Sequence, residues 1–192
     1  MVYLINDEGG FFVDPPFLML KKNNNNIGNY KGKDREEKFY TPTQLIDELF
    51  DLKDRFCDVD ITEYLENSAG AGYIIDRFDK PYIAYDINNE TNRDDIYECN
   101  YLKEKIEYKK GRVAITNPPF QAGLKFVYKS LKECDWCFTI LSQNSILNLD
   151  YTKYWVEEIQ LWRGYNFGDT KVSVCLMAVR KRREGDTYEY EN

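Results

Sequence analysis

The sequence contains no histidine among its 192 residues. Catalytic triads and dyads that use an imidazole as the general base are therefore excluded. Metal centres built on histidine ligands are excluded for the same reason. The remaining chemistry has to work with carboxylates, amides, hydroxyls and backbone carbonyls.

The sequence also has no long apolar run. No stretch reaches the roughly 18 consecutive apolar residues of a membrane helix, and the first six residues lack the basic and apolar regions of a signal peptide. We therefore expect no membrane contact and a cytoplasmic location, which would be the host cytoplasm for a phage-encoded chain.

The five cysteines, at positions 57, 99, 134, 137 and 175, cannot all pair, and we expect them to be reduced. Cys134 and Cys137 have the spacing of half a zinc site, but no second pair follows at metal spacing. We expect no metal and interpret this segment as a helix end that leads into a strand over residues 136–141.

The segment with the clearest chemical meaning is Asn117-Pro118-Pro119-Phe120, which follows the apolar run 113–116 at a predicted strand end. Its two prolines fix the φ angle and lack N–H groups, so the turn presents acceptors. An amide oxygen, a carbonyl oxygen and an aromatic ring suit a planar group that carries an NH2, because the oxygens accept its protons and the ring stacks on its face. This tetrapeptide is the candidate catalytic segment, with Phe120 as the stacking platform.

A nucleotide-type site is predicted upstream of the tetrapeptide. A strand candidate over 61–66 leads into a turn with Gly70 and Gly72, and residues 73–78 have helical spacing. Glycines let the backbone approach a ligand, and a following helix directs N–H groups toward it. A second strand over 81–85 ends in Asp86, about 20 residues after Glu66, where adenosine-binding βαβ units place a ribose-binding carboxylate.

With these motifs in order, residues 38 to 180 or so resemble the S-adenosylmethionine-dependent amino-methyltransferases, specifically the adenine-N6 branch. The resemblance implies a class I methyltransferase fold, S-adenosylmethionine as the cofactor and residues 117–120 as the catalytic motif. It also places the cofactor on Tyr40, Thr41, Glu66, Ser68, Gly70, Gly72, Asp86 and Asn100. The chain departs from the family at Asn67, where proline is usual, and at Asn100, where aspartate is usual. The Asn100 amide oxygen can still accept from the cofactor's N6 amine.

A second match to the tetrapeptide occurs at Asp14-Pro15-Pro16-Phe17. Too few residues separate it from the motif at Tyr40 to hold the strands that would have to follow a catalytic segment. We interpret it as a coincidental turn. Methyl transfer also agrees with the absence of histidine, because the sulfonium carries its own leaving group and the protein has mainly to position the nucleophile.

The remaining pattern predicts an α/β fold with a doubly wound, mostly parallel seven-stranded sheet and a C-terminal antiparallel hairpin, as the resemblance also implies. Apolar spacing predicts helices over 42–56, 122–134 and 151–158 and a strand over 172–180. Residues 144–150 are expected to form a loop at the active-site edge. Residues 1–37 are predicted to be an N-terminal extension, and 38–192 the methyltransferase domain, with no separate target-recognition domain.

The net charge of −7 is a poor overall match to nucleic acid, so contacts to phosphates must be local. Candidate basic clusters are 109–112, the helical set Lys125, Lys129 and Lys132, and 180–183. Phe167 is a second candidate for base stacking. Sequence recognition is left to a partner subunit or a homodimer.

Three hypotheses follow for function. The first is transfer of a methyl group to the N6 amine of adenine in nucleic acid, with DNA favoured over RNA. The second is methylation of a glutamine side chain in a protein, although relatives of that kind usually carry tyrosine where Phe120 stands. The third is a catalytically silent subunit that keeps the fold and binds nucleic acid or a partner.

Overall fold

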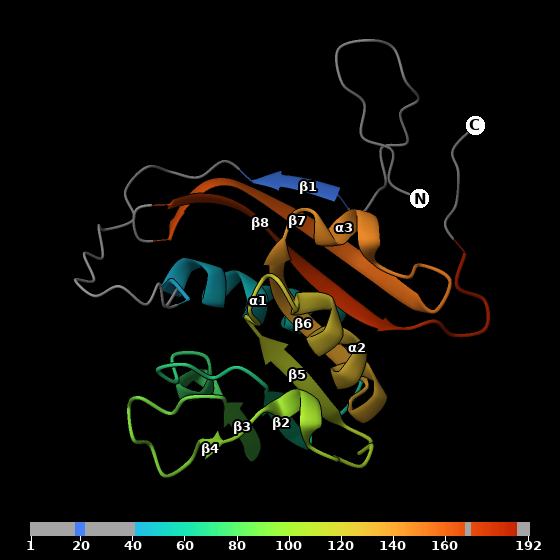
Figure 1. Cartoon of the computed structure of the whole chain (residues 1–192). Helices are drawn as coiled ribbons and strands as arrows, with labels where there is room; N and C mark the ends of the chain where they lie inside the picture. The colour runs from blue at the N-terminus through green and yellow to red at the C-terminus, as the bar shows by residue number, and fades with distance from the viewer. Residues whose placement is uncertain (1–17, 22–40, 168–169, 188–192) are drawn as a thin grey trace.

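The structure is a computed structural model that describes residues 18–21, 41–167 and 170–187 (Figure 1). One mixed sheet forms its centre, with the strand order β1-β7-β8-β6-β5-β2-β3-β4. The strands are β1 Leu18–Lys21, β2 Glu63–Glu66, β3 Tyr82–Asp86, β4 Tyr97–Glu98, β5 Arg112–Thr116, β6 Trp136–Ser142, β7 Tyr154–Phe167 and β8 Thr170–Lys181. The helical segments are α1 Thr43–Phe56, η1 Ile75–Arg77, η2 Tyr101–Lys103, α2 Gly123–Glu133 and α3 Ser145–Asn148.

The predicted fold class is confirmed. Strands β2 to β6 pair in parallel, whereas β8 pairs antiparallel with both β6 and β7. The last two strands form the long C-terminal hairpin that runs across the upper part of Figure 1. Strand β1, from the segment predicted to be an extension, adds to the edge of this hairpin in parallel with β7. The sheet thus has eight strands, whereas the sequence predicted seven.

The strand order fixes where a ligand should bind. Strands β2 and β5 are neighbours in the middle of the sheet, and the chain proceeds outward from them through β3 and β4 on one side and β6 on the other. In such sheets, ligands bind outside the carboxyl ends of the strands at the point where the order reverses. Glu66 ends β2 and Thr116 ends β5. The glycine turn and the tetrapeptide therefore begin side by side.

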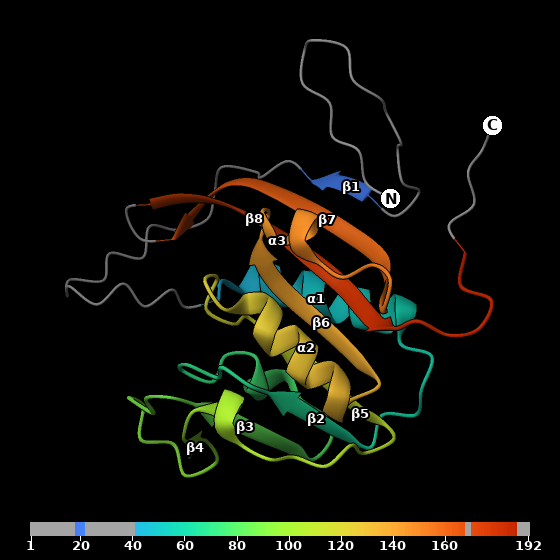
Figure 2. The same ribbon diagram turned by 45° about the vertical axis from the view of Figure 1, so that its right-hand side comes forward.

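Two helices cover opposite faces of the sheet, as Figure 2 shows from a second direction. The side chains of β6 alternate between these faces. Cys137 and Leu141 pack with the apolar residues of α2, whereas Phe138 and Ile140 pack with those of α1. A strand that is buried on both faces reads as a continuous apolar run, which is why its bounds follow the prediction closely.

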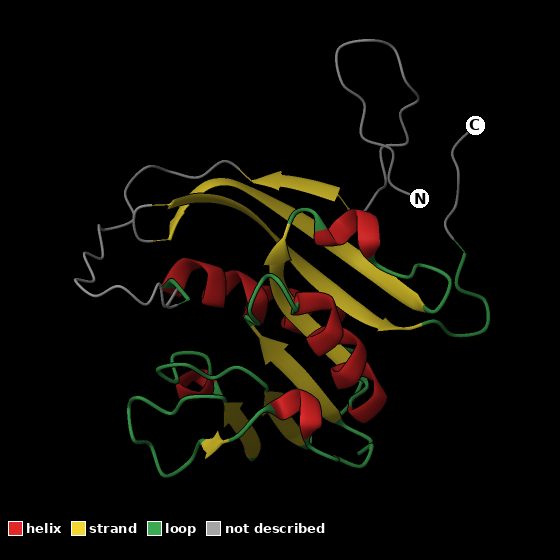
Figure 3. Ribbon diagram, viewed as in Figure 1, coloured by secondary structure: helices red, strands yellow, loops and turns green. Residues whose placement is uncertain are grey.

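The helix predicted over 73–78 is wrong. Turns follow Gly70 and Gly72, and the only helical segment described there is the three-residue η1. Figure 3 shows that only short helical segments accompany β2, β3 and β4. Both glycines have positive φ angles, of +53° and +89°, which interrupt right-handed helical geometry before a regular helix can start.

The helix predicted over 151–158 is also wrong, because most of this segment belongs to β7. A register shift between Val156 and Glu158 interrupts the alternation of β7, so its period of two is hidden in the sequence. The segment also ends in two adjacent acidic residues, Glu157 and Glu158. Glu158 is buried and accepts two hydrogen bonds from Arg55 of α1, at 2.5 and 2.8 Å.

No helix in the described ranges is long and apolar enough to cross a membrane.

Candidate active site

Thr116 joins the ends of the two central strands. Its side chain is fully buried, and its Oγ1 atom lies 2.7 Å from Oε1 of Glu66 and 2.6 Å from Oδ1 of Asn67. Ser68 completes the cluster, because its backbone N–H donates to Glu66 Oε1 at 3.0 Å and its hydroxyl lies 3.0 Å from Thr116 Oγ1. The sequence offered one signal for Thr116, a hydroxyl residue at the end of an otherwise apolar strand, and our reasoning missed it.

Glu66 is a fully buried carboxyl group with one unsatisfied oxygen. Its Oε2 atom is buried and has no hydrogen-bond partner among the described residues. Burial raises the pKa of Glu66 to about 8, because a charged carboxylate loses its hydration there. Buried polar atoms are nearly always paired, so Oε2 is suited to a group that the folded chain does not supply.

Asp86 holds the glycine turn in place. The Gly70 N–H donates to Asp86 Oδ2 at 2.7 Å, and the Asn88 N–H donates to Oδ1 at 2.9 Å. The carboxylate predicted to bind ribose thus also ties the turn after β2 to the end of β3. Each oxygen keeps a second lone pair, which is enough to accept a ribose hydroxyl.

Arg93 packs against the second glycine. A Cβ atom at Gly72 would lie 2.4 Å from the Nη1 atom of Arg93, whose guanidinium pairs with Asp76 at 2.7 Å and with Asp95 at 2.8 Å. This ion pairing keeps the pKa of Asp95 below its usual range. Glycine at position 72 therefore leaves room for a side chain that ties the loop after β3 to the turn.

Asn117 directly follows β5 and is oriented by Thr41. Its Nδ2 atom donates to Thr41 Oγ1 at 3.0 Å, whereas its Oδ1 atom is buried without a partner in the described residues. The side chain therefore offers an unused acceptor whose direction is fixed from the amide's other end. Pro118 is buried, and the Pro119 carbonyl accepts the Ala122 N–H at 2.9 Å, which starts the turn into α2.

Phe120 stands between the core and a pocket. The side chain is half-buried and packs against the core on the α1 side of the sheet. It also lines a pocket of about 320 Å³, whose other walls come from the start of α2 and from the segment after β6. The polar residues at this pocket are Gln121, Lys125, Ser142, Asn144, Ser145 and Asn148. The segment 144–150 therefore does border the tetrapeptide, and residues 145–148 form the short helix α3 rather than a loop.

Asn100 caps η2, because its side chain accepts the Leu102 N–H at 3.1 Å. The oxygen predicted to accept from the cofactor's adenine is thus already fixed by one backbone bond. Other predicted positions cannot be placed. Tyr40 and the second tetrapeptide, Asp14–Phe17, lie outside the described residues. Phe167 is the last residue of β7, but the structure does not describe its side chain.

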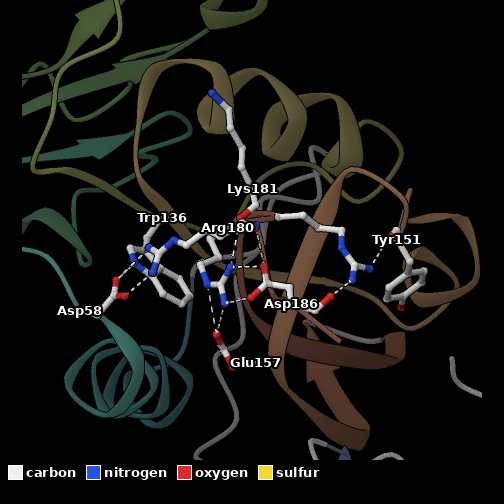
Figure 4. A network of polar contacts seen from close by, with 9 residues as sticks. Asp58, Trp136, Tyr151, Glu157, Arg180, Lys181 and Asp186 are labelled. Carbon is white, nitrogen blue, oxygen red and sulfur yellow. Dashed lines mark hydrogen bonds and ion pairs between the residues drawn. The ribbon is translucent and has the colours of Figure 1, made fainter. Parts of the chain in front are cut away.

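Two arginines of the C-terminal basic cluster, 180–183, pair with acidic side chains (Figure 4). Arg180 is buried and pairs with Glu157 at 2.9 Å and with Asp186 at 2.6 Å. Arg183 pairs with Asp58, and this contact lowers the pKa of Asp58 to about 2. These arginines stabilise the end of the hairpin, which leaves little of their charge for a phosphate track.

The other two basic clusters are also partly paired. Arg112 is buried and pairs with Glu63 at 2.5 Å, and Lys109 pairs with the same carboxylate at 2.7 Å. Lys129 pairs with Glu133 one turn along α2. Lys125 is exposed and lines the pocket beside Phe120, so it is the basic residue best placed for a phosphate near the tetrapeptide.

Several solved structures with a similar fold are described as methyltransferases. A protein from Pyrococcus horikoshii described as an RNA methyltransferase superposes with a TM-score of 0.62 at 15% identity, over 79% of this chain and 92% of that one. The 23S rRNA methyltransferase ErmE gives 0.54 at 14% identity, over 77% and 71%. A dimethyladenosine transferase from Plasmodium falciparum gives 0.55 at 11% identity, over 76% and 65%.

The fold is that of the class I methyltransferases. At these identities the likeness establishes the fold alone. No known family matches the sequence as a whole, and no curated protein sequence is similar to it. The activity therefore has to be argued from the residues at the ends of β2, β3 and β5.

Proposed function

We propose that this protein transfers a methyl group from S-adenosylmethionine to the N6 amine of adenine in nucleic acid. The observation that carries the proposal is the buried, unpartnered Oδ1 atom of Asn117, held by Thr41 from the other end of its amide. An exocyclic amine supplies the donor that this atom needs. The half-buried ring of Phe120, three residues further on, supports the base in the adjoining pocket.

The residues at the end of β2 fit S-adenosylmethionine. Oε2 of Glu66 is a buried atom that needs a partner, and a Cβ atom at Gly70 would meet nothing within 4 Å, so the turn after β2 has open space at that position. Asp86 keeps lone pairs for ribose hydroxyls while it holds Gly70. When bound, the cofactor supplies a methyl group that is already activated for transfer.

The role of the tetrapeptide follows from the nucleophile. The N6 lone pair of adenine is delocalised into the ring, so the amine becomes nucleophilic only as it pyramidalises and its protons become more acidic. Asn117 Oδ1 and the Pro118 carbonyl accept hydrogen bonds from those protons and bind that state better than the flat ground state. Differential binding of this kind accelerates a reaction.

The substrate is proposed to reach the site through local contacts. Most of the basic clusters are paired, and Lys125 stands exposed at the pocket. A partner subunit or a second copy of the chain is proposed to add the remaining affinity and sequence recognition. The sequence favours DNA, whereas two of the named structural neighbours are described as RNA methyltransferases, so the assay must include both polymers.

The test is an incubation with methyl-labelled cofactor and a panel of duplex DNA, single-stranded DNA, RNA and cell-extract protein, followed by nucleoside and amino-acid analysis. We expect label in N6-methyladenine. Label in glutamine would instead support the protein methyltransferase hypothesis. Cofactor binding without any transfer would support the silent subunit.

A further inference from the structure

A chain of buried hydrogen bonds connects the end of β2 to α2, and its outer half has a fixed direction. Glu133 pairs with Lys129, and the Tyr101 hydroxyl donates to Glu133 Oε2, at 2.6 Å. The Ser130 hydroxyl, 3.2 Å from Tyr101 Oη, must then donate to it. Ser130 Oγ in turn accepts from Nδ2 of Asn67 at 2.8 Å. The oxygen of the Asn67 amide thus faces Thr116.

The inner half of the chain is short of one proton, because the Ser68 hydroxyl lies 3.4 Å from both Glu66 Oε1 and Asn67 Oδ1 and cannot supply the proton of either shorter contact that Thr116 makes. Thr116 Oγ1 lies 2.6 Å from the Asn67 oxygen and 2.7 Å from Glu66 Oε1. Both distances are those of hydrogen bonds, but a hydroxyl has a single proton to donate. If Thr116 donates to Asn67, the contact with Glu66 needs a proton that only the Glu66 carboxyl group can carry.

The reverse amide orientation of Asn67 does not remove the problem. With its nitrogen toward Thr116, the hydroxyl could donate to an ionised Glu66. Ser130 would then donate to the Asn67 oxygen, and its contact with Tyr101 would have no proton. A neutral Glu66 provides a proton for each of the two short contacts of Thr116 and leaves Ser130 free to donate to Tyr101, as a buried polar network requires.

The surroundings of Glu66 also favour its neutral form. On β3, Asp86 acts on it as a like charge, and on β6 burial keeps the thiol of Cys137 protonated. On β5, the adjoining side chain is the uncharged Thr116. On α2, Glu133 forms an ion pair with Lys129. Burial is the largest cause of the raised pKa of Glu66, and the charge of Asp86 adds to it.

Given the cofactor assigned above, we propose that Glu66 carries a proton in the ligand-free protein and releases it when S-adenosylmethionine binds. The O–H bond of the carboxyl group breaks, the proton passes to the solvent, and the negative charge remains on Glu66. Thr116 then turns its hydroxyl toward the carboxylate. The chain thereby makes Glu66 a specificity-determining residue that favours the cationic cofactor over the product.

The discrimination follows from charge. S-adenosylmethionine carries a sulfonium and S-adenosylhomocysteine a neutral thioether, so only the cofactor adds a positive charge that stabilises an ionised Glu66. Linkage then requires that the affinity for the cofactor rise with pH by up to about tenfold per unit while Glu66 is protonated in the free protein. The affinity for the product should rise much less. The ratio of the affinity for the cofactor to the affinity for the product therefore increases from acidic to neutral pH.

Isothermal titration calorimetry of the whole chain tests this directly. Titrations in buffers of different ionisation enthalpy count the protons released per ligand. Near pH 6.5 we expect about one proton for S-adenosylmethionine and far fewer for S-adenosylhomocysteine. Glu66→Gln should abolish the difference. Binding of the cofactor without proton release would overturn this inference and leave the cofactor assignment standing, whereas absence of binding would overturn both.

A measurement on the ligand-free protein shows whether the hydrogen-bond chain controls the protonation of Glu66 or only stabilises the fold. Carbon-13 spectra of labelled glutamate should show one carboxyl signal, missing in Glu66→Gln, that titrates well above the ordinary range of glutamate. Thr116→Val should move its midpoint upward, because the carboxylate loses a donor. Asn67→Ala should move it downward, because Thr116 becomes free to donate to Glu66. A normal midpoint in the wild type, or shifts of the same sign in both variants, would contradict the proposal.

Discussion

The side-chain amide of Asn117 is tied to Thr41, 76 positions earlier in the chain, by a hydrogen bond of 3.0 Å from Nδ2 to Oγ1. Thr41 stands just before α1, and Asn117 directly follows the central strand β5. Because this bond uses Nδ2, the amide atom that remains without a partner is the buried oxygen, Oδ1. Thr41, in the segment that resembles the family's opening motif, is thus directly hydrogen-bonded to Asn117, in the Asn-Pro-Pro-Phe segment.

Thr41→Val should lower turnover. Valine keeps the shape but accepts no hydrogen bond, so the amide of Asn117 can rotate away from the orientation that presents Oδ1. The loss of one such bond, about 0.5–1.5 kcal/mol, predicts a decrease in kcat of about threefold to tenfold. Single-turnover methylation measures it. Thr43→Val, at an exposed position in the first turn of α1, is the matched control and should retain full activity.

Replacement of Asp86 should weaken cofactor binding in two steps. Asp86→Asn keeps an oxygen for one backbone N–H but loses the charge, and Asp86→Ala loses the contacts to both Gly70 and Asn88. We expect the alanine variant to bind S-adenosylmethionine more weakly by about 1–3 kcal/mol, with the asparagine variant between it and the wild type. Calorimetry can test this order, with the exposed Asp94→Ala as a control. Unchanged affinity in Asp86→Ala would rule out the ribose assignment.

Glu66→Gln should stabilise the ligand-free protein at alkaline pH. The pKa of Glu66 is raised from 4.5 to about 8, so its contribution to stability is greatest below pH 4.5 and is lost as the pH rises through 8. Glutamine stays neutral and avoids that loss. At pH 8 we expect a gain on the order of 2–4 kcal/mol in the free energy of unfolding, which should shrink toward pH 5. Urea denaturation at both values checks it, with the exposed Glu184→Gln as a control.

Variants of Phe120 should separate stacking from packing. The ring both lines the pocket and contacts the core on the α1 side, so Phe120→Ala should lower stability as well as methylation. Phe120→Leu retains apolar volume and should regain most of the stability. It should still lose about 1–3 kcal/mol of substrate affinity, because an aliphatic side chain does not stack on a base. A leucine variant with normal methylation would show that the ring only packs the core.

The sequence was informative where local chemistry decides the structure. The strand ends at Glu66, Asp86 and Thr116 and the turn at residue 117 follow from apolar runs that stop at polar residues or prolines, and the structure keeps them. Strand β7 could not be predicted, because Glu158 looks solvent-exposed in the sequence. Its burial depends on Arg55, 103 positions away, and no local pattern records such a partner.

The candidate site shows the same division. The motif residues could be proposed from the sequence because glycine, aspartate and the Asn-Pro-Pro-Phe turn carry their own chemistry. The chain from Glu66 through Thr116 and Asn67 to Ser130 could not, because it depends on side chains from three elements that meet only in the folded sheet. Asn67 appeared as a departure from the family, whereas the structure gives each end of its amide a partner.

The central claim is that Asn117 accepts from the amine that becomes methylated, and one single-turnover comparison tests it most directly. Asn117→Ala should fold, bind S-adenosylmethionine as the wild type does and lose about 10²- to 10³-fold in the rate of adenine methylation, the usual effect of removing one aligned group in a transition state. Asp14→Ala, in the second tetrapeptide, should behave like the wild type. An Asn117→Ala protein that methylates adenine at the wild-type rate would contradict the account.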